Sequence, residues 1–156
     1  SEMCIRDSRD MANRLNRYNL AREGAAKQQM AYDLAVRYYQ ASCYGDCWFL
    51  THYYSSVMDS ARSWEKDFAA ETVKYLNVAK RSDDLQLRYH SVYALAFMPV
   101  DKWAEFEYDG KVILYPHSAQ YEALYELSLF AMAYPNVVDQ YTRRCDVLKK
   151  YEYYLP

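Results

Sequence analysis

Residues 64–79, WEKDFAAETVKYLNVA, carry the clearest helical pattern in the chain. Apolar or small side chains recur there every three or four residues, at Trp64, Phe68, Thr72, Val73, Leu76 and Ala79. This spacing places them on one face of an α-helix, with the charged residues on the other faces. The stretch therefore predicts an amphipathic helix that packs against neighbouring elements.

Comparable spacing recurs along the rest of the chain. The further helices that we expect cover residues 10–23, 25–42, 46–58, 85–96, 121–132 and 136–148, with a break within 55–63. The inward positions are Met11, Leu15 and Tyr18; Ala31, Leu34, Ala35, Tyr38 and Ser42; Leu50, Thr51, Tyr54 and Val57 or Met58; Leu85, Tyr89, Val92, Tyr93 and Ala96; Tyr121, Leu124, Tyr125, Ser128, Ala131 and Met132; and Val138, Tyr141, Cys145 and Leu148.

Capping and helix-breaking residues separate these segments. Glycine and proline interrupt the helical pattern at Gly24, Gly45, Pro99, Gly110, Pro116 and Pro135. The N-caps that we predict are Asp46, Asp83 with Gln86 three residues later, Ser118, and Asn136 with Asp139. Residues 99–116 have no helical period, and EYDGKVIL at 107–114 fits either a small hairpin around Asp109-Gly110 or a loop.

These patterns predict an all-α fold of about six or seven helices. Short turns between the helices favour antiparallel pairs, and small and tyrosine side chains recur on the inner faces. We therefore expect the terminal part of an α-solenoid of the tetratricopeptide-like kind, although no strict repeat period is present. The chain contains 19 tyrosines, which we expect to bury their rings and leave their hydroxyls near water.

The first eight residues, SEMCIRDS, do not belong to this pattern. Met3 to Asp7 match the translation of an adapter used in transposase-based sequencing libraries, so we expect residues 1–8 to be adapter-derived. Residues 9–156 are then a helical-repeat domain fragment that lacks its N-terminal part. The first helix should expose Met11, Leu15 and Tyr18 to the repeat that precedes it.

Charge and hydropathy exclude several classes of partner. The formal net charge is -2, from 19 basic and 21 acidic residues, so we expect no nucleic-acid binding. The longest apolar run, Val92 to Val100, is too short for a membrane span. The residues themselves do not indicate a localisation.

The densest group of reactive side chains is SCYGDCWFLTHYY at 42–54. Cys43, Cys47 and His52 could bind zinc, but a second ligand pair at the usual spacing is missing. A disulfide between Cys43 and Cys47 and a reactive Cys47 thiol at a helix start are two further readings. Packing of small apolar side chains at a helix corner is the interpretation that we favour, for these cysteines and for Cys145. We therefore predict no metal ligands and no cofactor.

Aromatic residues and carboxylates give no catalytic signature. Trp48 and Trp64 fall at helix starts, whereas Trp103 lies in the irregular segment with Phe106 and Tyr108, where we expect exposure. The carboxylates Asp83, Asp84, Glu105 and Glu107 form no pair that spacing places across a cleft, and the first two suit helix capping. No phosphate-binding loop or nucleophile motif is present, so we assign no catalytic residue.

Several of these stretches together resemble one family of large bacterial proteins. The stretches are LNRYNLARE at 15–23, CWFLTHYY at 47–54, WEKDF at 64–68, YPHSAQYEALYELSLFAMAYP at 115–135 and RRCDVLKKYEYY at 143–154. They are similar to the C-terminal region of uncharacterised tetratricopeptide-like repeat proteins of gut-dwelling Gram-negative bacteria. Cys43 and the EYDGKVIL stretch depart from that pattern. The resemblance implies export to the periplasm or cell surface.

The function expected from these observations is that of a non-enzymatic scaffold or protein-interaction module. Its partner would be another protein or the missing N-terminal repeats, bound at the concave helix face. The alternative is a fragment of a glycan-binding or glycan-processing αα-barrel, motivated by the tyrosine and tryptophan content. That alternative requires two carboxylates facing a shared cleft, roughly 5–10 Å apart.

Overall fold

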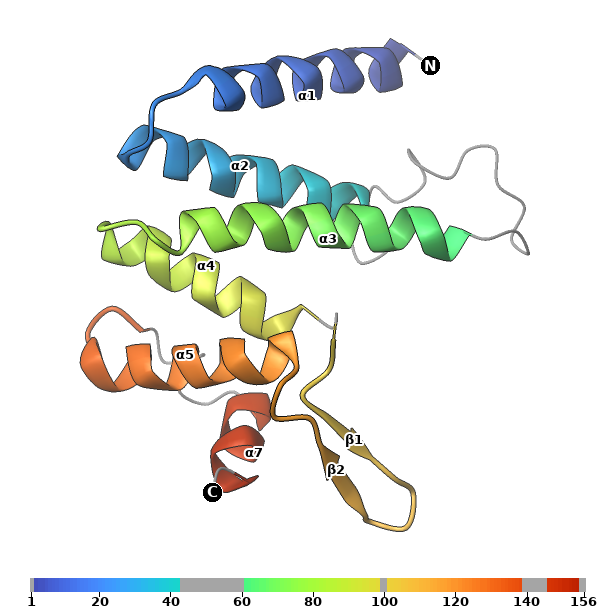
Figure 1. Ribbon diagram of the computed structural model, residues 1–156, viewed down its shortest axis with the longest axis vertical. Helices are drawn as coiled ribbons and strands as arrows, with labels where there is room; N and C mark the ends of the chain where they lie inside the picture. Colours follow the sequence, from blue (N-terminus) through green and yellow to red (C-terminus); the bar gives the residue numbers. More distant parts are fainter. Residues whose placement is uncertain (1, 43–60, 99–100, 139–145, 155–156) are drawn as a thin grey trace. The chain divides into compact units, whose positions relative to one another are not determined.

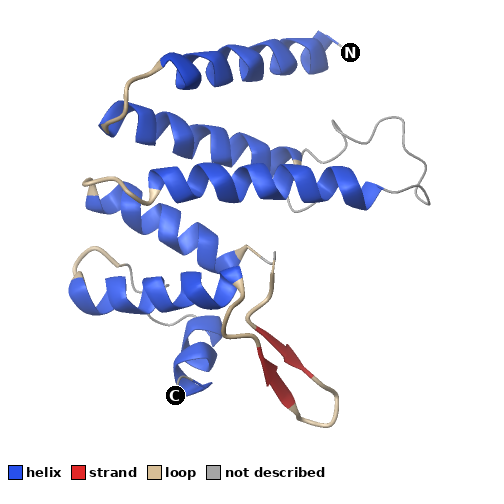
Figure 2. Ribbon diagram, viewed as in Figure 1, coloured by secondary structure: helices blue, strands red, loops and turns tan. Residues whose placement is uncertain are grey.

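A computed structural model of the chain describes residues 2–42, 61–98, 101–138 and 146–154. These ranges contain six helices and one two-stranded sheet, so the predicted all-α fold class is confirmed (Figures 1 and 2). No helix within them is both long enough and apolar enough to cross a membrane. The contacts divide the chain into two units, Ser1–Asp83 and Asp84–Pro156, and each is described by itself.

The described part of the first unit contains three helices, each antiparallel to the next (Figure 1). They are α1 (Glu2–Leu20), α2 (Ala25–Ala41) and α3 (Ala61–Ala79). The α2–α3 pair buries mainly small residues, Ala31 and Ala35 from α2 and Ala69, Thr72 and Ala79 from α3. Small side chains let two helix backbones approach closely, and Leu34 and Leu76 are buried in the same unit.

The turn from α1 to α2 depends on Gly24 and Lys27. Gly24 has a φ of 148°, a value that side-chain-bearing residues rarely adopt. Lys27 donates to the carbonyl of Ala21 at 3.3 Å, pairs with Glu23 at 3.2 Å, and lies 4.8 Å from the centre of the Tyr18 ring. A positive charge beside the last carbonyls of α1 stabilises that helix end and fixes the start of α2.

Aromatic rings connect all three helices of the first unit. Tyr75 of α3 is stacked on Tyr38 of α2, with ring centres 5.6 Å apart and planes 5° from parallel. The edge of Tyr18, from α1, meets the same Tyr75 ring at 5.2 Å and 89°. Phe68 extends the cluster at 5.8 Å from Tyr38. Tyr75 is 3% exposed, so its ring is the centre of this contact.

The second unit contains α4 (Leu85–Phe97), β1 (Ala104–Phe106), β2 (Val112–Leu114), α5 (Ala119–Ala133) and α7 (Asp146–Tyr154). Helices α4 and α5 are antiparallel (Figure 1) and bury Leu87, Tyr89, Val92, Leu95, Leu124, Leu127 and Phe130. The strands pair in the register Ala104↔Leu114, so the hairpin reading of residues 107–114 was correct. Gly110, with a φ of 87°, closes the turn, and Asp109 accepts from the Lys111 amide at 2.9 Å.

Polar side chains fix the start of α5 in place. The Gln120 amide donates to the Ala96 carbonyl at 3.0 Å and accepts from the Trp103 amide at 3.2 Å. Asp101, with a positive φ of 56°, accepts from the Ala119 amide at 2.7 Å. Because a helix end leaves backbone groups without partners, these bonds satisfy the end of α4 and the start of α5 together.

Three predicted N-caps fall on described residues, and only Ser118 is confirmed among them. Ser118 accepts from the Tyr121 amide at 3.2 Å, as expected. The cap of α4 is Asp84 and not Asp83, because the Asp84 carboxylate accepts from the amides of Gln86 and Leu87 at 2.9 and 3.2 Å. A cap needs both an acceptor and an extended backbone at the same position, and adjacent aspartates leave the sequence ambiguous by one residue.

The predictions for the first helix, for the last helix and for the helix at 46–58 have different outcomes. Met11, Leu15 and Tyr18 are half-buried within the first unit. No helix starts at Asn136, which lies in a turn, and α7 as described starts at Asp146. The predicted helix at 46–58 with its cap Asp46 lies outside the described residues.

Truncating Tyr75 should destabilise the first unit more than truncating any exposed tyrosine. Replacing a buried aromatic residue by alanine typically costs about 3–5 kcal/mol, so we expect Tyr75→Ala to lower the free energy of unfolding by that order. Urea denaturation followed by far-UV circular dichroism measures the change. Tyr39→Ala, at a 39% exposed tyrosine of α2, is the matched control and should cost less than about 1 kcal/mol. Equal losses in the two variants would contradict the central role of Tyr75.

Alkaline pH should weaken the same cluster. Burial, with a smaller contribution from Tyr38 and Glu71, raises the pKa of Tyr75 to about 12. In the unfolded chain this phenol ionises near its ordinary pKa of about 10. The unfolded state therefore loses its proton first, and stability falls as the pH rises from about 10 to 12, by about 1 kcal/mol after allowance for solvent screening.

Thermal unfolding between pH 9 and pH 12 measures this effect. Tyr75→Phe keeps the ring and removes the ionisable group, so its stability should fall less steeply over that interval than that of the unmodified chain. Identical slopes would show that Tyr75 does not contribute to the alkaline loss.

Candidate functional site

The cysteine-rich stretch that the sequence singled out cannot be placed. Cys43, Cys47, His52 and Trp48 lie outside the described residues, and so does Cys145. Trp64 belongs to α3, but its side chain is also outside the described part. Among the side chains that the structure does describe, no three histidines, cysteines or carboxylates gather in a way that could hold a metal ion.

Trp103 occupies a different environment from the one that we expected. It is 5% exposed, so the expectation that it faces solvent was wrong. The indole packs edge-on against Tyr151 at 5.6 Å and Phe106 at 5.7 Å, and Tyr154 lies 6.4 Å away. The hairpin brings this indole against α7, a long-range contact that local sequence cannot reveal. Phe106 and Tyr108, in the same segment, are exposed.

The carboxylates noted in the sequence do not gather at one site. Asp84 caps α4, and Asp83 is exposed beside it. Glu105 and Glu107 are exposed on the hairpin. Partial burial, together with these two carboxylates, raises the pKa of the Tyr115 phenol. Their arrangement suits a hairpin surface.

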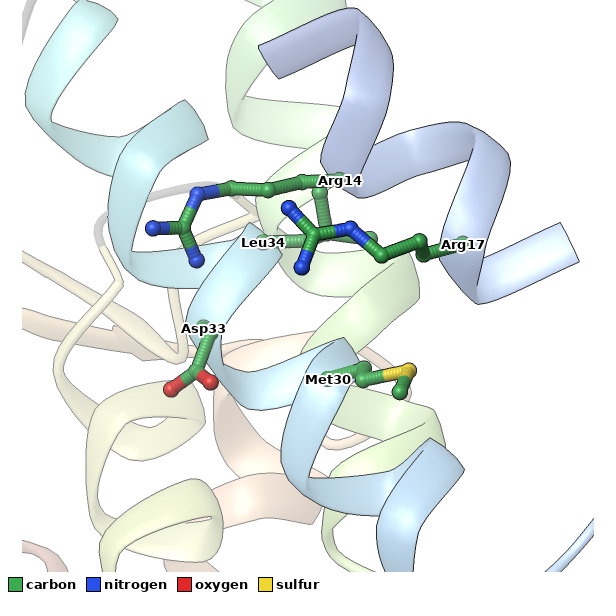
Figure 3. Close-up of a pocket in the computed structure, with 5 residues that line it drawn as sticks. All are labelled: Arg14, Arg17, Met30, Asp33 and Leu34. Atoms are coloured by element: carbon green, nitrogen blue, oxygen red, sulfur yellow. The ribbon is translucent and has the colours of Figure 1, made fainter. Parts of the chain in front are cut away.

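A pocket of about 150 Å³ lies between α1 and α2 of the first unit (Figure 3). Helix α1 contributes Arg14 and Arg17, one helical turn apart, and α2 contributes Met30, Asp33 and Leu34. Figure 3 shows the two guanidinium groups side by side on one wall, with the Asp33 carboxylate and the Met30 side chain on the opposite wall. The pocket therefore combines cations, one anion and an apolar floor.

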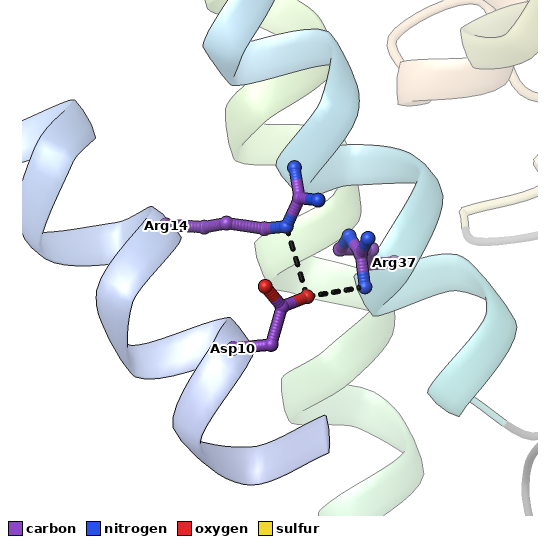
Figure 4. Close-up of polar contacts among 3 residues, drawn as sticks. All are labelled: Asp10, Arg14 and Arg37. Atoms are coloured by element: carbon purple, nitrogen blue, oxygen red, sulfur yellow. Dashed lines mark hydrogen bonds and ion pairs between the residues drawn. The ribbon is translucent and has the colours of Figure 1, made fainter. Parts of the chain in front are cut away.

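An ion-pair network beside the pocket holds its two helices together (Figure 4). The Asp10 carboxylate oxygen Oδ2 accepts from Arg14 Nε at 3.0 Å and from Arg37 Nη1 at 2.9 Å. Arg14 and Arg37 belong to different helices, so one carboxylate bridges α1 and α2. The hydrogen bond from Arg14, with the charges of Arg37 and Arg17, holds the pKa of Asp10 below its usual range.

The remaining charges of the pocket are less constrained. Among the described residues, Arg17 has no ion-pair or hydrogen-bond partner for its guanidinium group. Asp33 accepts one hydrogen bond, from the Gln29 amide at 3.2 Å on the same exposed helix face. Arg14 uses Nε for Asp10. Arg17 and the lightly bonded Asp33 carboxylate therefore lie on opposite walls of the pocket.

The second unit has a candidate surface of another kind, on α5. Tyr125, Leu129 and Met132 are 49%, 47% and 80% exposed, and their spacing of four and three residues places them on one face. We predicted Tyr125 and Met132 to face inward, which was wrong, because Leu127 and Phe130 occupy the core instead. Helix α5 is apolar on both of these faces.

Sequence reasoning missed the residues of the pocket. Arg14, Arg17, Met30, Asp33 and Leu34 show a weak signal in retrospect, since positions 14 and 17, and 30, 33 and 34, each fall on one helix face. What brings them together is the packing of α1 on α2, which no short motif encodes. Comparisons with family models, with curated proteins and with solved structures find no match to the chain.

Tyr151 offers a test of the aromatic cluster around Trp103. Its side chain is 1% exposed, and its hydroxyl has no hydrogen-bond partner among the described residues. Since an unsatisfied buried hydroxyl is costly, Tyr151→Phe should leave stability unchanged or raise it by up to about 1 kcal/mol. Thermal unfolding measures the shift, and Tyr153→Phe, at an 81% exposed tyrosine, should have no effect. A clear loss in Tyr151→Phe would mean that the hydroxyl does have a stabilising partner.

Proposed function

We propose that the chain is a non-enzymatic helical module that binds another protein, as the terminal part of an α-solenoid. The observation that supports this most directly is the second apolar face of α5, formed by Tyr125, Leu129 and Met132. Exposed apolar side chains gathered on one helix face mark a surface that a partner normally covers.

The partner that fits this face is the apolar side of an amphipathic helix. The three side chains span eight residues of α5, about 10 Å at the usual helical rise, which matches two turns of an opposing helix. The exposed Glu122, three residues before Tyr125, adds a negative charge at the rim. A partner helix with lysine or arginine beside its leucine stripe therefore complements both the apolar stripe and the charge.

The assignment to exported repeat proteins of gut bacteria stays a prediction from the sequence resemblance. If it holds, the partner is a periplasmic or cell-surface protein or a neighbouring repeat of the same chain. The glycan-binding alternative is weakened because Trp103, the tryptophan that we expected to be exposed, is buried. No observation in the described residues favours that alternative enough for a second proposal.

Two synthetic helical peptides test the proposal. Both carry the same leucine stripe at positions i, i+4 and i+7, one with lysine and the other with glutamate on the flanks. We expect the lysine peptide to bind at least tenfold more tightly, as measured by fluorescence anisotropy.

The double variant Leu129→Glu/Met132→Glu separates specific docking from general charge attraction. It adds two negative charges at exposed positions, so non-specific attraction of the lysine peptide would increase, whereas docking on the stripe should be lost. Tyr153→Glu, at an exposed residue of α7, is the control and should leave binding unchanged. Unchanged or stronger binding to the double variant would refute the α5 surface as the docking site.

A further inference from the structure

The pocket between α1 and α2 contains opposite charges that the packing of the helices does not use. Asp10 already pairs with both Arg14 and Arg37, and these bonds hold α1 against α2. Arg17 and Asp33 take no part in that network through any bond among the described residues, yet both line the pocket. The helix contact would persist without either of them.

The two charged walls define what a ligand must present. Arginine binds a carboxylate through parallel N–H donors, and Arg14 stands beside Arg17 on the same wall (Figure 3). The Asp33 carboxylate on the other wall accepts a single hydrogen bond, from Gln29, and so retains acceptor positions for a cationic donor. A ligand that spans the pocket would therefore carry a negative group at one end and a positive group at the other.

The volume of the pocket and its apolar residues limit the size and the polarity of the part of the ligand that lies between the two charged groups. A cavity of about 150 Å³ accommodates a molecule of benzene size, on the order of six to nine non-hydrogen atoms. Met30 and Leu34 are the apolar residues among those that line the pocket. A short aliphatic body between the two charges matches this lining.

We propose that this pocket binds a small zwitterion with an aliphatic body, an amino acid of about the size of leucine. Its carboxylate lies against Arg17 and Arg14, its ammonium group against Asp33, and its side chain on Met30 and Leu34. A peptide terminus carries only one of the two charges next to its end residue, so a free amino acid complements the pocket better than a chain end does. This inference is independent of the α5 surface.

Three matched compounds test the proposal on the full chain. L-leucine carries both charges, 4-methylpentanoate lacks the ammonium group, and 3-methylbutylamine lacks the carboxylate. Titration followed by two-dimensional NMR of the backbone amides reports binding, and we expect saturable shifts at Arg14, Arg17, Met30, Asp33 and Leu34. Leucine should bind about tenfold more tightly than either analogue, because each analogue leaves one charged wall without a partner.

Two variants assign the charges, with a matched control for each. Arg17→Gln and Asp33→Asn should each weaken leucine binding about tenfold. In Arg17→Gln, leucine should bind no more tightly than 3-methylbutylamine, which lacks the carboxylate. In Asp33→Asn, leucine should bind no more tightly than 4-methylpentanoate, which lacks the ammonium group. Arg22→Gln and Asp83→Asn change exposed residues of the same charge outside the pocket and should leave binding unchanged. Arg14 is kept, since its bond to Asp10 supports the helix contact.

Several outcomes would overturn the proposal. These are equal binding of leucine and 4-methylpentanoate, shifts that map elsewhere than the five lining residues, or no saturable shift up to about 50 mM leucine. Unchanged binding in both Arg17→Gln and Asp33→Asn would overturn it as well. None of these results bears on whether α5 binds a protein, so the two proposals can fail separately.

Discussion

The first unit depends on the ring of Tyr75, because that ring is the point where all three helices meet. Tyr38 stacks on one face of it and the edge of Tyr18 meets it almost at a right angle. Parallel and edge-on contacts of this kind contribute beyond simple burial, since the positive edge of one ring faces the negative face of another. The small residues of α2 and α3 bring two helices together, and Tyr18 joins α1 to the same aromatic cluster. The partly buried ion pairs of Asp10 with Arg14 and Arg37 add a second contact between α1 and α2.

In the second unit, hydrogen bonds perform the comparable task. Gln120 bonds to the end of α4 and to the segment before β1, while Asp101 bonds to the first turn of α5. These bonds are local in space but distant in sequence, and they fix where the hairpin leaves the helices. The indole of Trp103 is thereby placed against Tyr151 of α7. The hydrogen bonds of Gln120 and Asp101 thus determine where Trp103 packs against Tyr151.

Much of the fold could be predicted from the sequence, because helical spacing and helix breakers are local properties. The stripe Ala31, Leu34 and Ala35 is buried as predicted, Ser118 is a cap, and the turn at Asp109-Gly110 forms a hairpin. Errors arose where a choice between neighbours depends on distant partners. Asp83 and Asp84 differ by one position, and Tyr125 and Leu127 lie on faces of α5 that only the packing of α4 distinguishes.

The candidate sites could not be predicted from the sequence, for the same reason. Arg14, Arg17 and Asp33 are ordinary residues of amphipathic helices until α1 and α2 are placed side by side. Tyr75 was overlooked because it lies at the margin of the stripe from Trp64 to Ala79, one position from Leu76. An apolar stripe on a helix has width, and the sequence does not say which margin meets a neighbour.

The stack of Tyr38 on Tyr75 also makes the first unit visible to spectroscopy. Two phenol rings held 5.6 Å apart and within 5° of parallel form an asymmetric pair that absorbs in the near ultraviolet. Fixed aromatic packing produces near-ultraviolet circular dichroism, and that signal disappears when packing loosens while helices persist. The chain therefore carries, without any added label, an intrinsic optical reporter of fixed aromatic packing, to which this stack contributes.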